Sequence, residues 1–99
     1  NLERVQASWQ KRLIDHLNRH KRYPEVARDR RTQGTVIVAF KLDRTGQVVA
    51  SHVTASSGSP ALDDEAMAVL KRASPLPAPP DQILGPMLDM VLPIQFLIK

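Results

Sequence analysis

The 99-residue chain contains no cysteine and few aromatic residues. Without cysteine, disulfides, thiolate metal sites and a cysteine nucleophile are excluded, although the cellular compartment stays open. With so few aromatic rings, the core must be mainly aliphatic. No apolar run approaches the roughly 18 residues of a membrane span, and no signal peptide is visible. The aromatic residues are Trp9, Tyr23, Phe40 and Phe96.

The length of the chain and its hydrophobic content of 42% predict a single domain over residues 1–99. Because the chain begins with Asn1 rather than methionine, we expect a piece of a longer protein, with any anchor or targeting segment outside it. The basic charge is concentrated in the first half. Residues 1–44 hold eleven Lys or Arg against five acids, a balance of +6, and the remainder holds three against five, or −2.

Six of these basic residues are close together in the sequence, and two interpretations of them stay open. They form either a patch that attracts an acidic partner or the ordinary solvated end of a helix. Nucleic-acid binding is not expected, because only Tyr23 interleaves with the basic residues and the predicted sheet offers little aromatic surface for stacking bases. The six are Arg19, Lys21, Arg22, Arg28, Arg30 and Arg31.

The first segment predicts an amphipathic helix over residues 2–21, in which one face carries Leu2, Val5, Trp9, Leu13 and Leu17. His16 and His20 flank this stripe at a spacing that suits a metal ion. Because no third ligand has plausible spacing, we expect them to flank the core instead.

A short segment over residues 23–31 follows, because Tyr23-Pro24 breaks the first helix. Val26 and Ala27 are expected to point inward. For Tyr23, packing as a corner over the core and a recognition role both stay open.

The middle of the chain predicts a hairpin over residues 34–56 and a helix over residues 60–73. In the second strand, Val49, Ser51 and Val53 are expected on the inner face. Ser59 is expected to cap the helix, with Pro60 at its first position. The proline-dense stretch at residues 74–80 predicts a stiff, extended strut.

The last segment predicts a strand over residues 89–98, because large apolar side chains recur at every second position. Pro93 has no backbone N–H for a ladder, so this is expected to be an edge strand. Pairing of this strand with the first gives an α+β fold, a three-stranded antiparallel sheet of order 2-1-3 with two helices on one face. The outer edge is then open, either for a partner's strand or for self-association.

Catalysis is not expected, and the sequence predicts no catalytic, cofactor-binding or metal-binding residue. Ser56 or Ser57 with His52 and Asp63 would be a candidate triad, but the serines lack the G-x-S-x-G context of a nucleophile. The acids at the start of the 60–73 helix are expected to act as helix caps.

An ordered set of motifs resembles the C-terminal domain of TonB-type energy transducers, over about residues 9 to 98. The set runs from Tyr23-Pro24 with Ala27, through Gly34 and the Asp43 to Gly46 turn, to Ser56-Ser57-Gly58, Leu62-Asp63, the proline tract and Pro93-Ile94 with Phe96. The long first helix with Trp9 is similar to longer members, including HasB-like paralogues dedicated to haem uptake.

The resemblance implies a periplasmic domain, anchored in the inner membrane of a Gram-negative bacterium by a segment outside this chain that works with ExbB and ExbD. It implies that the domain binds the TonB box and the plug of outer-membrane receptors, the box as a strand added beside the third strand, here Val91 to Leu97. Lys21 and Arg22 depart from the uncharged residues that often precede the Tyr-Pro motif. A homodimer through the open edge stays an alternative. The expected contacts are Arg22, Tyr23, Pro24, Arg28, Arg31, Val91, Leu92, Pro93, Ile94, Gln95, Phe96 and Leu97.

Overall fold

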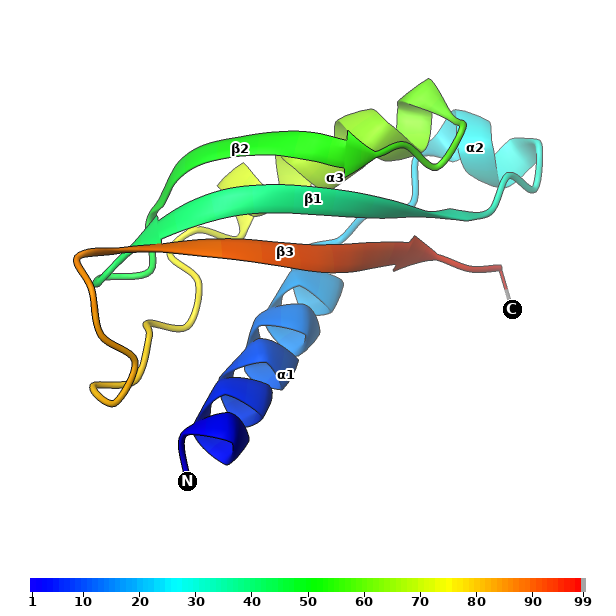
Figure 1. The fold of residues 1–99 in the computed structure, drawn as a ribbon. Helices are drawn as coiled ribbons and strands as arrows, with labels where there is room; N and C mark the ends of the chain where they lie inside the picture. Colours follow the sequence, from blue (N-terminus) through cyan, green and yellow to red (C-terminus); the bar gives the residue numbers. More distant parts are fainter. Residues whose placement is uncertain (99) are drawn as a thin grey trace.

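The structure, a computed structural model, describes residues 1–98 and contains a three-stranded sheet and three helices (Figure 1). The elements are α1 (Leu2–His20), α2 (Glu25–Asp29), β1 (Gly34–Asp43), β2 (Val48–Ala55), α3 (Pro60–Arg72) and β3 (Met87–Phe96).

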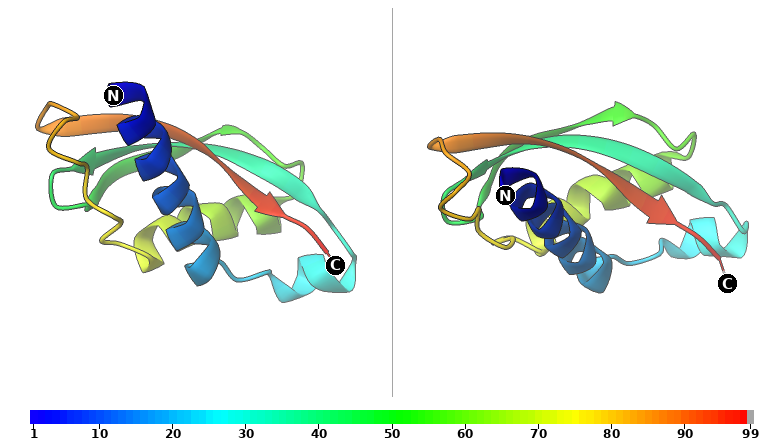
Figure 2. Two further views of the ribbon diagram at one scale, coloured as in Figure 1. Left: turned by 90° about the horizontal axis from the view of Figure 1, so that it is seen from below. Right: turned by 60° about the horizontal axis from the view of Figure 1, so that its bottom comes forward.

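The sheet has the order β2-β1-β3, and β1 is antiparallel to both neighbours. Seen from below, the helices all lie in front of the same face of the sheet (Figure 2). The predicted α+β class, strand order and one-sided helix layer are therefore confirmed. The opposite face of the sheet is left open.

Helix α1 buries Trp9, Leu13 and Leu17 against the sheet and α3, as its periodicity predicts. The expectation for Leu2 is wrong, because the N-terminal end of α1 extends away from the sheet and leaves this side chain exposed (Figure 1). The side chain of Asn1 caps the helix by accepting a hydrogen bond of 2.7 Å from the N–H of Glu3. The helix ends at His20 because Lys21 adopts an extended conformation.

Helix α2 is a single short turn in which only Ala27 is buried. Val26 is exposed, so its predicted inward position is wrong. Successive helical residues point about 100° apart, and in α2 it is Ala27 that faces the core.

The hairpin of β1 and β2 contains a bulge that the sequence did not predict. Leu42 pairs with Val48 and Lys41 with Ala50, so Val49 is the extra residue between them. The bulge leaves Val49 exposed, and the expectation that it shares the inner face with Ser51 and Val53 is wrong.

Helix α3 begins as predicted, with the hydroxyl of Ser59 accepting from the N–H of Leu62 at 3.5 Å and Pro60 in the first position. Its buried stripe closes the core beneath β1 and β2. That stripe contains Leu62, Ala66, Val69 and Leu70.

The segment from residue 74 to residue 86 is tied to the rest of the fold along its length. The indole of Trp9 donates to the carbonyl of Pro77 at 2.9 Å, and the N–H of Leu76 donates to the carbonyl of Gly46 at 2.8 Å. The guanidinium of Arg44 donates to the carbonyls of Pro80 at 3.2 Å and Ile83 at 2.5 Å. The proline tract is thus a fastened part of the domain, whereas the sequence predicts a strut held by its own stiffness.

Strand β3 runs from Met87 to Phe96, two residues earlier at each end than predicted. It begins early because Met87 pairs with Asp43 at the turn end of β1. It ends early because Phe96 pairs with Gly34, the first residue of β1, which leaves Leu97 without a ladder partner in β1.

Candidate functional site at the edge of the sheet

The outer edge of β3 is the most regular edge in the part of the chain that the structure describes. Its ten pairs with β1 run from Gly34 and Phe96 to Asp43 and Met87 without a register shift. The β1–β2 ladder, in contrast, shifts register twice, and such bulges hinder the pairing of a further strand. A partner strand therefore finds a continuous template at β3.

Two contacts show which backbone groups of β3 face outward. The carbonyl of Ile37 accepts from the hydroxyl of Thr54 on β2 at 3.2 Å, so the backbone of Ile37 points away from β3. Pro93 lies opposite Ile37, and in an antiparallel ladder its backbone then also points away from β1. The carbonyl of Gln95, two residues on, accepts from Lys21 on the same outer side.

Because the backbone groups of successive residues point to opposite sides of a strand, every second residue of β3 directs its backbone groups outward. Asp89, Val91 and Gln95 direct their N–H groups outward, while Asp89, Val91 and Pro93 direct outward carbonyls. Pro93 therefore sits where its missing N–H costs no bond to β1, as the sequence predicts for an edge strand.

The side chains of β3 divide the predicted contact residues into two groups. Val91, Pro93 and Gln95 are exposed, and Val91 retains 60% of its surface. The other group, Leu92, Ile94 and Phe96, has side chains in the core and backbone groups directed toward β1. These three therefore support the edge from behind, and Leu97 lies beyond the strand with an exposed side chain.

Two hollows that the sequence did not predict lie between the edge of β3 and α1. One, of about 220 Å³, is lined by Ile14, Asn18, Pro93 and Gln95. The other, of about 210 Å³, lies near the start of the strand and includes Gln6, Gln10, Trp9 and Met90. They lie where alternate side chains of an added strand would point toward the helix layer.

Lys21 is a further residue of the edge, although the sequence placed it only in the basic cluster and marked it as a departure from the family pattern. Its Nζ donates to the carbonyl of Gln95 and, at 3.3 Å, to the side-chain oxygen of Asn18. The same ammonium lies 5.2 Å from the ring centre of Phe96. Burial lowers the pKa of Lys21 from its ordinary value.

Tyr23 fastens the segment before α2 to the end of β3. Its hydroxyl donates to the carbonyl of Thr32, and its ring meets Phe96 edge to face with centroids 5.7 Å apart. Pro24 next to it is half-buried. The corner-packing interpretation of Tyr23 is thus confirmed, and its remaining surface lies beside the outer edge.

Arg22, Arg28 and Arg31 are all exposed. Within residues 1–98, the ion pairs join Lys11 to Asp15, Lys41 to Asp89 and Arg72 to Glu65, so the six-residue basic cluster contributes to none of them. The backbone N–H of Arg22 donates to the carboxylate of Glu65 at 2.7 Å.

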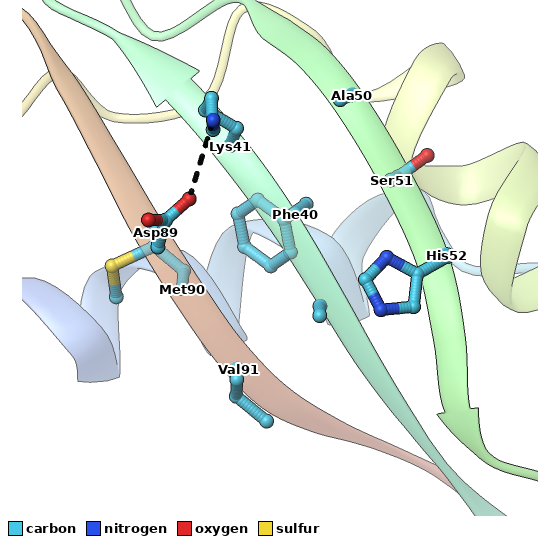
Figure 3. A pocket seen from close by; sticks show the side chains of 9 residues that line it. Phe40, Lys41, Ala50, Ser51, His52, Asp89, Met90 and Val91 are labelled. Atoms are coloured by element: carbon cyan, nitrogen blue, oxygen red, sulfur yellow. Dashed lines mark ion pairs between the residues drawn. The ribbon is translucent and has the colours of Figure 1, made fainter.

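The open face of the sheet carries a hollow of about 360 Å³ (Figure 3). It exists because Ala39 and Ala50 are small, while Val91, His52 and the ion pair of Lys41 with Asp89, at 3.9 Å, surround them. His52 belongs to this open face, whereas Asp63 is on α3 beneath the sheet and accepts from the hydroxyls of Ser56 and Ser57. The candidate triad is therefore not assembled.

The described residues contain no cluster of three or more metal-ligating side chains. His16 donates from Nε2 to the carbonyl of Ala73 at 2.8 Å, and His20 donates from Nδ1 to the carbonyl of His16 at 2.9 Å. The His16 bond thus joins α1 to the end of α3, whereas the His20 bond lies within α1. Among residues 1–98, no helix has the length and apolar character that a bilayer crossing requires.

The fold defines a small α+β domain with one regular outer strand at the edge of its sheet. A family model described as Gram-negative bacterial TonB protein C-terminal matches residues 19–98. The chain belongs to this TonB C-terminal family, as its motifs predict.

Sequence relatives agree with this assignment. The chain is 40% identical over 78 residues to protein TonB of Pseudomonas putida, covering 79% of this chain and 32% of that protein. It is 35% identical over 69 residues to protein TonB of Pasteurella multocida, covering 70% of this chain and 27% of that protein. The chain therefore spans about a third of the length of these relatives.

Solved structures share the fold. The HasB C-terminal domain is 45% identical, with a TM-score of 0.60 and coverage of 89% of this chain and 68% of that one. The solution structure of the Helicobacter pylori TonB C-terminal domain has a TM-score of 0.78, with coverage of 93% and 82%. At 24% identity, the Helicobacter pylori likeness concerns the fold alone.

Proposed function

We propose that this domain binds an extended peptide, the TonB box of an outer-membrane receptor, as a fourth strand on the outer edge of β3. The observation that carries the proposal is the outer edge of β3, which no strand within residues 1–98 pairs with, and on which Pro93 removes no bond to β1. Strand addition is a general mode of peptide recognition, in which backbone bonds give affinity and pockets for alternate side chains give specificity. The role is binding and transmission of force, not catalysis.

The expected affinity is modest. A strand of about five residues adds about four ladder bonds, at about 0.5–1.5 kcal/mol each, and part of this gain is offset by ordering of the peptide. The box alone therefore binds with micromolar or weaker affinity. Bonds pulled along the strand share the load, so a weak contact of this kind holds transiently and then releases.

The contact surface in this proposal joins the β3 edge to the segment before α2. Val91, Pro93 and Gln95 meet the added strand directly, and Tyr23 with Pro24 flanks its end. Leu97 continues the exposed apolar surface beyond the strand. Arg22, Arg28 and Arg31 attract acidic parts of the receptor, such as its plug.

The wider setting is also part of the proposal. The domain works in the periplasm of a Gram-negative bacterium and is connected to an inner-membrane helix outside this chain. That helix works with an ExbB/ExbD-type complex, which supplies energy from the proton-motive force for uptake of siderophores, haem or similar cargo. The 45% identity to the HasB C-terminal domain favours, as an alternative, a paralogue dedicated to haem uptake.

An NMR titration of the labelled domain with a TonB-box peptide tests the binding mode. Strand addition predicts shifts of the Val91 to Leu97 amides and of those around Tyr23. In a folded Gln95→Pro variant, binding should weaken because an outward N–H is lost, whereas Gln95→Val keeps that N–H and should bind normally. Unchanged binding by Gln95→Pro contradicts the register.

The basic residues make a separate test possible. If they attract the receptor, its dissociation constant should rise between about 50 and 500 mM salt, where screening differs strongly. Equal affinity at both concentrations would show that attraction by Arg22, Arg28 and Arg31 is unimportant.

Self-association is the second candidate, because the same open edge fits the edge of another copy. Sedimentation at increasing concentration distinguishes the two. A dimer formed through β3 would compete with the peptide, whereas a monomer with peptide-dependent shifts supports receptor binding.

A further inference from the structure

The outer edge of β3 has one outward carbonyl that is already occupied by the protein itself. This carbonyl belongs to Gln95, and the ammonium of Lys21 donates to it. Ladder alternation places it in line with the outward carbonyls of Asp89, Val91 and Pro93. An added strand that reaches the end of β3 must therefore meet Lys21.

Lys21 is held in this position from both sides. Its backbone follows directly on α1, and the N–H of the next residue, Arg22, binds the carboxylate of Glu65 at 2.7 Å. Its ammonium is shared with Asn18 at 3.3 Å and lies over the ring of Phe96. The contact with Gln95 is thus part of a local network that includes the last turn of α1.

The surroundings of this ammonium lack a negative charge within ion-pair distance. The hydrogen-bond partners of Lys21 are a backbone carbonyl and a side-chain amide, both uncharged, and among residues 1–98 it forms no ion pair. Arg19 and Arg22 add further positive charge nearby in the sequence. Partial burial lowers the pKa of Lys21, which means that the charged form is incompletely compensated.

A carboxylate on the partner would supply the negative charge that the surroundings of the Lys21 ammonium lack. A charge-assisted hydrogen bond between an ammonium and a carboxylate is stronger than one to a neutral carbonyl. The ammonium would then leave the carbonyl of Gln95 free to accept an N–H from the added strand.

We propose that Lys21 is a latch on the β3 edge, and that the domain prefers extended segments carrying an acidic side chain at the end that lies beside Gln95. The inference rests on the proposed strand addition and specifies the chemistry of the partner at one end of the strand. It does not depend on the identity of the receptor.

The test uses blocked peptides of alternating valine and threonine, with glutamate or glutamine at the first or the last position. Affinities for the chain and its Lys21→Met variant are measured by fluorescence anisotropy at low salt. Methionine keeps an aliphatic side chain over Phe96 and removes the ammonium. Lys71→Met, which removes the same charge from the exposed surface of α3, is the matched control.

We expect glutamate to improve binding about fivefold over glutamine at one end of the peptide only, because Lys21 lies at one end of β3. The favoured end also reports whether the added strand is parallel or antiparallel to β3. In Lys21→Met this preference should disappear, and the glutamine peptide should bind at least as tightly as it binds the unaltered chain. Lys71→Met should retain the full preference.

Three results would overturn the latch. Equal binding of glutamate and glutamine peptides, with amide shifts along Val91 to Leu97, would reject it and leave strand addition intact. A glutamate preference that survives in Lys21→Met would assign the effect to Arg19 or Arg22 instead. If no peptide binds and the receptor's own box also fails to shift the β3 amides, strand addition itself is rejected, and the latch with it.

Discussion

The indole Nε1 of Trp9 donates a hydrogen bond of 2.9 Å to the carbonyl oxygen of Pro77. This contact joins the first helix to the proline segment across 68 positions of sequence. The ring itself is buried in the core with 2% of its surface exposed. Trp9 therefore holds α1, the proline segment and the core together at a point close to the start of β3.

Replacing Trp9 with phenylalanine should lower the free energy of unfolding by about 2–4 kcal/mol. The change leaves the Pro77 carbonyl without its donor and opens a cavity in the core. Urea unfolding followed by far-UV circular dichroism measures the loss. Ser8→Ala, an exposed neighbour on the same helix, should change stability by less than about 0.5 kcal/mol. Equal effects of the two changes would contradict the role given to the indole.

The Arg72 and Glu65 pair connects α3 to the end of α1. Arg72 also donates to the carbonyl of His20 at 3.0 and 3.1 Å, and the side chains of Arg72 and Glu65 are only 29% and 11% exposed. Arg72→Met should therefore cost about 1–3 kcal/mol, because it leaves a largely buried carboxylate with one fewer donor.

A double-mutant cycle with Glu65→Gln isolates the coupling energy between Arg72 and Glu65 from the other contacts that each residue makes. We expect coupling well above that of an exposed ion pair, measured by urea unfolding. The same cycle on the exposed pair of Lys11 and Asp15, with Lys11→Met and Asp15→Asn, serves as the comparison and should give little coupling. Coupling no larger than for Lys11 would show that the Arg72 pair is only a surface contact.

The sequence predicted those features that follow from short-range rules. The alternation in β3, the missing N–H of Pro93 and the cap formed by Ser59 each depend on a few adjacent residues, and the structure agrees with them. The sheet order followed from pairing the last strand with the first. These rules sufficed for the fold and for the position of the open edge.

The details that the sequence did not reveal depend on contacts between distant segments. Val49 has the pattern of an inward residue, but a register shift against β1 turns it outward. The contacts of Arg44 with the carbonyls of the 80–85 stretch and of Lys21 with Gln95 join segments 36 or more positions apart. The residues next to a long, flexible basic side chain in the sequence do not indicate which distant group it will contact. The hollows between α1 and β3 likewise depend on how two elements pack.

Stability should fall as the pH is lowered through the acid range, because two carboxylates have a lowered pKa in the folded chain. Burial of Asp63 acts to raise its pKa, but hydrogen bonds from Ser56 and Ser57 outweigh it. For Asp43, the bond from the Thr45 hydroxyl is the largest cause of the lowered pKa, followed by the Gln47 N–H.

The sign follows from proton binding. With its pKa lowered on folding, each carboxylate binds more protons in the unfolded state, so its stabilising contribution is present above the unfolded pKa of about 3.9 and is lost as the pH falls through the folded pKa. Thermal unfolding between about pH 5 and pH 2 measures the slope. The slope should flatten in Asp63→Asn with Asp43→Asn, whereas Asp81→Asn, at an exposed position, serves as control. An unaltered slope in the double variant would contradict this assignment.

Gly46 and Gly58 have nearly the same backbone angle but different surroundings, and replacing each with alanine should separate strain from steric overlap. Their φ angles are +90° and +89°, a region that costs an alanine about 1–2 kcal/mol at either position. A Cβ on Gly46 would lie 2.0 Å from the carbonyl oxygen of Leu76, whereas a Cβ on Gly58 would meet nothing within 4 Å. Since the N–H of Leu76 also binds the carbonyl of Gly46, relief of the overlap would detach the proline segment from the hairpin turn.

Gly58→Ala should therefore lower the free energy of unfolding only by the cost of the backbone strain, while Gly46→Ala should lower it by at least about 2 kcal/mol more, as measured by urea unfolding. Hydrogen exchange of the Leu76 amide should accelerate in Gly46→Ala alone, and equal stability of the two variants would show that the turn and the segment are not coupled.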